Sequence, residues 1–77
     1  MNDPLIEVFA EVLEVDPAHL DENSSPDNVS AWDSFAAMKL VAAIEDRFSV
    51  HLSTRQIMSM SSIGLARKAL RGLNVQV

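Results

Sequence analysis

The 77-residue sequence contains no cysteine. The chain therefore has no disulfide bond, no thiolate ligand for a metal ion and no thiol nucleophile of its own. Any sulfur chemistry requires a group that is attached to the protein. A chain of this length has room for one small hydrophobic core, so we expect a single domain over residues 1–77 with a net stability of about 4 to 10 kcal/mol.

Residues 1–33 contain no lysine or arginine, whereas they contain nine aspartate and glutamate residues. This part of the chain has a formal charge of −9. Residues 34–77 contain six basic and two acidic residues, which gives +4 and accounts for the net charge of −5. The acidic balance argues against nucleic acid as a partner, and it leaves open a small basic face on the last predicted helix.

Long apolar runs are also missing. No segment approaches the length of a membrane span, and the first residues show neither the basic region nor the apolar run of a signal peptide. We therefore expect a cytoplasmic protein that does not bind membranes. His19 and His51 lie far apart without the spacing of metal ligands, so we expect both to be solvated and no metal to be bound.

The spacing of apolar residues predicts an all-α domain of four helices. We expect helices at residues 4–14, 34–48, 54–58 and 62–72, with Asp3 as the first N-cap and Pro4 at the first helical position. Residues 15–33 are rich in proline, asparagine, aspartate and serine, which predicts a long ordered loop. Three apolar side chains are expected to tether this loop: Leu20, Val29 and Trp32.

The helix over residues 34–48 is expected to be buried on most sides. Its helical projection separates a narrow outer face from a broad apolar face. The outer face contains Ala36, Lys39, Ala43, Asp46 and Arg47, and the apolar face contains Phe35, Met38, Leu40, Val41, Ala42, Ile44 and Phe48.

The last predicted helix has an apolar inner face and a basic end. The inner face contains Ile63, Ala66, Leu70 and Leu73. Arg67, Lys68 and Arg71 stand near the negative end of the helix dipole, where they either stabilise the helix or form a binding face.

Ser34 follows Asp33 at the exposed start of the second predicted helix, where three interpretations apply. A serine there can be an ordinary cap for unpaired backbone N–H groups. A nucleophile would need a neighbouring base, and neither His19 nor His51 lies within helical reach of Ser34 in the sequence. A modification site is the third interpretation, since a phosphodiester would meet the positive end of the helix. Taken alone the motif favours the cap, and only the rest of the chain can decide.

Further motifs occur around Ser34 in a fixed order. They are residues 13–20, Trp32-Asp33-Ser34-Phe35, Met38-Lys39-Leu40-Val41, residues 44–48, His51-Leu52, Ile57 and Ser62-Ile63. In order and spacing these stretches resemble the acyl carrier protein family, which includes peptidyl and aryl carrier domains. Trp32-Asp33-Ser34-Phe35 is similar to the family's Asp-Ser-Leu attachment motif, with phenylalanine in place of leucine.

The resemblance implies an acyl-carrier-type bundle of three long helices and one short helix, with 4′-phosphopantetheine attached to Ser34. A phosphopantetheinyl transferase would supply this group from coenzyme A and so make a phosphoprotein. The terminal thiol would hold an acyl group as a thioester for acyl-loading and acyl-transferring enzymes of a fatty acid, polyketide or related pathway. The protein itself would be no enzyme, and we expect a monomer.

In the family, the start of helix two and the preceding loop dock the partner enzymes. The corresponding residues are Asp33, Phe35, Ala36, Lys39 and Val29. Ala36, Ala37 and Lys39 stand where the fatty-acid-synthase type shows acids or hydroxyls, which weakens electrostatic steering toward partners with a basic patch. The sequence therefore looks more like a stand-alone carrier of a specialised pathway, such as polyketide, non-ribosomal peptide or special acyl transfer.

The remaining large side chains are assigned mainly to packing. Trp32 is expected to pack the long loop against the bundle. Met38, Met58 and Met60 are expected in the core or at its edge. The same methionines, with Ala42, are candidates to flank an acyl-chain pocket, because methionine adapts to irregular contents and alanine leaves room.

A competing interpretation is a non-catalytic helical interaction module. Its acidic first half would bind a basic partner, and Ser34 would be only a helix N-cap. The two interpretations differ in whether Ser34 accepts phosphopantetheine.

Overall fold

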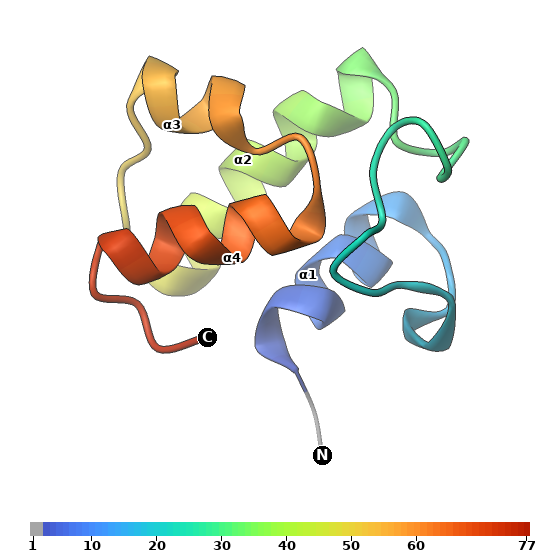
Figure 1. Ribbon diagram of the computed structural model, residues 1–77, viewed down its shortest axis with the longest axis horizontal. Helices are drawn as coiled ribbons and strands as arrows, with labels where there is room; N and C mark the ends of the chain where they lie inside the picture. The colour runs from blue at the N-terminus through green and yellow to red at the C-terminus, as the bar shows by residue number, and fades with distance from the viewer. Residues whose placement is uncertain (1–2) are drawn as a thin grey trace.

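The computed structural model describes residues 3–77. In these residues the regular structure is entirely helical, with α1 (Pro4–Leu13), the 3₁₀ turn η1 (Pro17–His19), α2 (Ser34–Phe48), α3 (Thr54–Ser59) and α4 (Ile63–Gly72), as Figure 1 shows. The predicted all-α class, with three longer helices and one short helix, is confirmed. The helix ends differ by one residue from the predicted ends of α1 and α3 and from the predicted start of α4.

Side-chain caps fix where the helices begin. Asp3 accepts hydrogen bonds from the amides of Leu5 and Ile6, which confirms it as the N-cap of α1. Ser53 caps α3 in a reciprocal pair with Gln56. Each cap satisfies backbone N–H groups that have no partner inside the helix.

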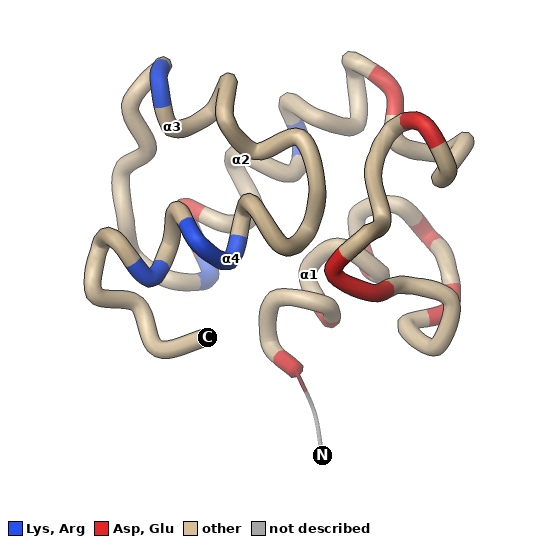
Figure 2. The backbone as a smooth tube through the Cα atoms, in the orientation of Figure 1, with Lys and Arg blue, Asp and Glu red and all other residues tan. Residues whose placement is uncertain are grey.

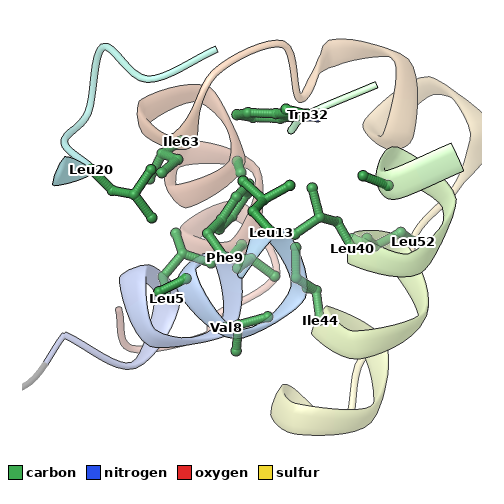
Figure 3. Close-up of a cluster of buried hydrophobic side chains, with 14 residues drawn as sticks. Leu5, Val8, Phe9, Leu13, Leu20, Trp32, Leu40, Ile44, Leu52 and Ile63 are labelled. Atoms are coloured by element: carbon green, nitrogen blue, oxygen red, sulfur yellow. The ribbon is translucent and has the colours of Figure 1, made fainter. Parts of the chain in front are cut away.

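The core lies where α1, α2 and α4 meet. Six large side chains are almost completely buried there: Leu5, Phe9, Leu40, Ile44, Ile63 and Leu70. Figure 3 shows Phe9 and Leu13 of α1 in the middle of this cluster, with Trp32 on one side. The Phe9 and Trp32 ring centroids are 5.1 Å apart, and Trp32 is 5% exposed, so the predicted packing of this ring against the bundle is confirmed.

Residues 14–33 form the long loop, which is held against the start of α4. The amides of Ile63 and Gly64 donate to the carbonyl oxygens of Ser24 and Glu22, each at 3.0 Å. A Cβ atom at Gly64 would lie 3.0 Å from the same Glu22 oxygen, so glycine permits this close approach. Of the three predicted tethers, Leu20 and Trp32 are buried and Val29 is half-buried.

The predicted burial of α2 is wrong in phase and in extent. Its buried stripe is Ala36, Leu40 and Ile44, spaced four residues apart and facing α1. Ala36 was expected on the outer face, whereas Phe35 and Met38, expected inside, are 69% and 73% exposed. The reason is that α1 covers one side of α2 and the six-residue α3 shields only a small part of the remainder.

Arg67 also departs from the sequence-based expectation. It was assigned to the basic end of the last helix, but its side chain is 10% exposed and pairs with Asp3 and Glu22. Ile63, Ala66 and Leu70 are buried as predicted. None of the described helices combines the length and the apolar character that a membrane span needs.

Candidate functional site

Asp33, and not Ser34, is the N-cap of α2. The Asp33 Oδ1 atom accepts a hydrogen bond from the Ala36 amide at 2.8 Å, and its carbonyl oxygen accepts from the Ala37 amide at 2.9 Å. Ser34 is the first helical residue, is exposed, and makes no side-chain hydrogen bond to any residue that the structure describes. The interpretation of Ser34 as an ordinary cap is therefore wrong, and its hydroxyl is accessible.

The helix end at Ser34 suits a negatively charged substituent. Within residues 3–77, the amides of Ser34 and Phe35 have no hydrogen-bond partner, because the first turn of a helix leaves such donors unpaired. These donors and the helix dipole favour an anion at this end. A phosphodiester on the Ser34 oxygen thus fits the residues present.

An open hollow lies beside Ser34. It has a volume of about 340 Å³ and is lined by Pro26, Trp32, Asp33, Ser34 and Ala37. Trp32 and Ala37 also line a much smaller apolar crevice, of about 40 Å³, together with Phe9, Leu40, Val41, Ile57 and Met60. The loop and α2 therefore place the only tryptophan between the candidate attachment point and the interior.

No imidazole stands ready to activate Ser34. Both histidines are exposed, and neither lines the hollow beside Ser34. His51 Nδ1 lies 3.5 Å from Glu45 Oε2, beyond the carboxyl-terminal end of α2, and His19 lies in η1. Among residues 3–77, no three histidine, aspartate or glutamate side chains are grouped as metal ligands would be.

The predicted docking residues fall into two groups. Asp33, Phe35 and Lys39 lie exposed at the start of α2, where Lys39 Nζ stands 4.8 Å from the centroid of the Phe35 ring. Ala36 is 7% exposed, so its side chain offers little surface to a partner. Val29 is half-buried in the loop, where it lines a separate hollow with His19 and Leu20.

The predicted acyl-pocket residues are not gathered around one cavity. Met60 lines the small crevice, and Met38 lines an open apolar depression of about 270 Å³ with Ala37, Val41 and Ile57. Ala42 is exposed and lines neither hollow; Met58 also lines neither and is 79% exposed. The expectation that Met38 and Met58 lie in the core or at its edge is wrong, because their side chains are 73% and 79% exposed.

An ionic cluster that sequence reasoning missed holds the long loop in place. Arg67 Nε and Nη2 donate to the Glu22 carboxylate at 2.8 and 2.9 Å, and Nη2 donates to Asp3 Oδ2 at 2.7 Å. Burial acts to raise the pKa of Asp3, but hydrogen bonds from Arg67 and from two backbone amides outweigh it and lower that pKa. The Arg67 hydrogen bonds likewise lower the pKa of Glu22, and both carboxylates raise the pKa of Arg67.

A protein-family model matches most of the chain. The family model described as "Phosphopantetheine attachment site" matches residues 3–67, which includes α1, the long loop, α2, α3 and the first half of α4. No curated protein matches the chain. The chain therefore belongs to the phosphopantetheine attachment site family, as a carrier domain of the acyl carrier type whose prosthetic group is 4′-phosphopantetheine.

Proposed function

We propose that Ser34 is the attachment residue and that the protein presents an acyl group to the enzymes of a fatty acid, polyketide or related pathway. The observation that carries this assignment is the exposed, unbonded Ser34 hydroxyl at the first residue of α2, with the capping task taken by Asp33. When bound, the phosphopantetheine supplies the thiol that the cysteine-free chain lacks, and this thiol holds the acyl group as a thioester.

The protein's own contribution is positional. Ser34 lies in the first turn of α2, and this turn is held in place because Asp33 accepts hydrogen bonds from the amides of Ala36 and Ala37. The Ala36 side chain is also buried. A group attached there searches a restricted volume around the helix start, and this raises its effective concentration at a docked enzyme. Catalysis is left to those enzymes.

The proposed partners are a phosphopantetheinyl transferase, which acts on Ser34 with coenzyme A as donor, and acyl-loading and acyl-transferring enzymes. Their proposed contact surface includes Asp33, Phe35 and Lys39, which are exposed next to Ser34. We further propose that the protein is a cytoplasmic monomer. Its pathway is proposed to be a specialised one, because α2 has no acidic residue before Glu45. Partners that recognise an acidic helix would find little charge there.

Intact-mass measurement tests the attachment residue. The purified chain is incubated with coenzyme A and a broad-specificity phosphopantetheinyl transferase, and we expect the mass of one phosphopantetheine to be added. Ser34→Ala should abolish this gain, whereas Ser30→Ala, which removes an exposed loop serine, should leave it unchanged. Modification of Ser34→Ala would contradict the assignment.

A further inference from the structure

The large apolar side chains that remain exposed are concentrated on two helices. Of the five, Phe35 and Met38 are on α2, and Ile57 and Met58 are on α3; Leu65 of α4 is the fifth. Met38 and Ile57 line the same apolar depression, which joins the two helices into one surface. Phe35 lies one turn before Met38 on the same side of α2, so the apolar surface begins next to Ser34.

The fixed charges on this surface are positive. Residues 34–44 of α2 contain one charged residue, Lys39, and α3 contains one, Arg55. Lys39 lies over the Phe35 ring, and Arg55 is three residues before Met58, which places it on the same side of α3. Asp33, the acidic residue nearest to this surface in the sequence, lies before Ser34 as the N-cap of α2, where its carboxylate accepts a hydrogen bond from the Ala36 amide. Phe35, Met38, Lys39, Arg55, Ile57 and Met58 are called the α2–α3 face below.

We propose that the α2–α3 face binds partner proteins whose docking surface is apolar and bordered by carboxylates. This inference rests on the proposed carrier function, and it specifies the chemistry of the partners that function needs. Apolar area gives a partner its binding energy, and a carboxylate placed against Lys39 or Arg55 gives orientation and selectivity. Partners that place lysine or arginine against the α2–α3 face would be repelled by Lys39 and Arg55.

Two other occupants fit the charges less well. In a symmetric pair of chains the α2–α3 face would contact a second copy of itself, which presents the same two cations and no carboxylate to pair with them. An anionic membrane attracts clusters of about four to eight basic residues, whereas this face has two and the whole chain has a charge of −5. A protein surface of opposite charge is the occupant that these residues favour.

Two synthetic peptides provide the test. Both are amphipathic fifteen-residue helices with the same leucine and phenylalanine face; glutamate borders that face in one and lysine in the other. Each is titrated into ¹⁵N-labelled Ser34→Ala protein at 150 mM salt, where interactions beyond roughly 8 Å are screened. Because this variant has no Ser34 hydroxyl, its peptide binding does not depend on whether Ser34 accepts phosphopantetheine.

We expect the glutamate peptide to bind roughly tenfold more tightly and to shift the amide signals of Phe35, Met38, Lys39, Ile57 and Met58. The double change Lys39→Glu with Arg55→Glu should reverse the preference, and Lys68→Glu, at an exposed position of α4, should not. The net charge of −5 alone predicts tighter binding of the lysine peptide. The order of affinities therefore separates recognition by the α2–α3 face from attraction by the overall charge.

Equal affinities, tighter binding of the lysine peptide, or signal shifts confined to another face would overturn the inference. So would concentration-dependent self-association through the same amides, or binding to vesicles of phosphatidylcholine and phosphatidylserine in a 3:1 ratio. In each of these cases the mass measurement on Ser34 still decides the carrier function separately.

Discussion

Asp33 and Ser34 are adjacent in sequence but have different surroundings. The Asp33 carboxylate accepts a hydrogen bond from the Ala36 amide, and this bond fixes the first turn of α2. Ser34 projects from that turn with its hydroxyl exposed. Capping by the aspartate leaves the serine available for modification, which a serine cap would not.

This division of tasks predicts different stability effects for the two residues. Asp33→Ala should lower the free energy of unfolding by about 1 kcal/mol, because an amide of α2 loses its side-chain acceptor. Ser34→Ala removes an exposed hydroxyl without a partner and should change stability by less than about 0.5 kcal/mol. Urea denaturation of both variants measures this; an equal loss in Ser34→Ala would mean that the serine also caps the helix.

At the scale of elements, the long loop and α4 depend on each other. Backbone carbonyl oxygens of the loop accept hydrogen bonds from the first two amides of α4. In addition, Arg67 of α4 forms an ion pair with Glu22 of the loop. Such contacts explain how a loop of this length is ordered without a sheet or a disulfide bond. Since the loop ends at Trp32 and Asp33, they also fix the position of Ser34.

Two glycines of α4 provide a matched test of the contact between loop and helix. Gly64→Ala places a methyl group 3.0 Å from the Glu22 carbonyl oxygen, so we expect a loss of about 1 kcal/mol or more. Gly72→Ala meets no atom within 4 Å and has no positive φ, so it should stabilise the protein by about 0.4 to 1 kcal/mol.

Thermal and urea unfolding of the two glycine variants gives the comparison. A stabilising Gly64→Ala would show that the loop moves away from α4 at little cost. In that case the loop would be held chiefly by its side chains.

At the scale of the whole molecule, the charge is divided between two sides. Figure 2 shows the acidic residues mainly along α1 and the long loop, and basic residues along α3 and α4. Arg67 joins the two sides, since it is buried between Asp3 at the start of α1 and Glu22 in the loop. The cluster therefore holds three segments together.

This cluster predicts a loss of stability in acid. The folded-state pKa values of Asp3 and Glu22 are lowered, so their contribution is present above the ordinary carboxyl values near pH 4. It is lost as the pH falls below those values and through the folded-state pKa values. Urea denaturation between pH 7 and pH 2.5 should follow this decline.

Arg67→Met removes the cation but keeps most of the side-chain volume. At pH 7 this change should lower the free energy of unfolding by about 1 to 3 kcal/mol, because charge-assisted hydrogen bonds are lost. The loss is limited because both carboxylates stay partly solvated. The variant should also lose less stability than the parent on acidification. Lys68→Met, at an exposed neighbouring position, is the control and should leave the acid profile unchanged.

The helices, the Asp3 cap and the packing of Trp32 were predictable from the amino-acid sequence, because they depend on local spacing and on the size of single side chains. The sequence also directed attention to Ser34 through an ordered set of motifs. Periodicity could not decide which side of α2 is covered, since that depends on where α1 and the short α3 lie. Only the tertiary structure buried Ala36 and exposed Phe35 and Met38. The pairing of Arg67 with Asp3 and Glu22 was also visible only in the tertiary structure. These partners are 64 and 45 positions away in the sequence, and contacts at such separations leave no trace in helical spacing.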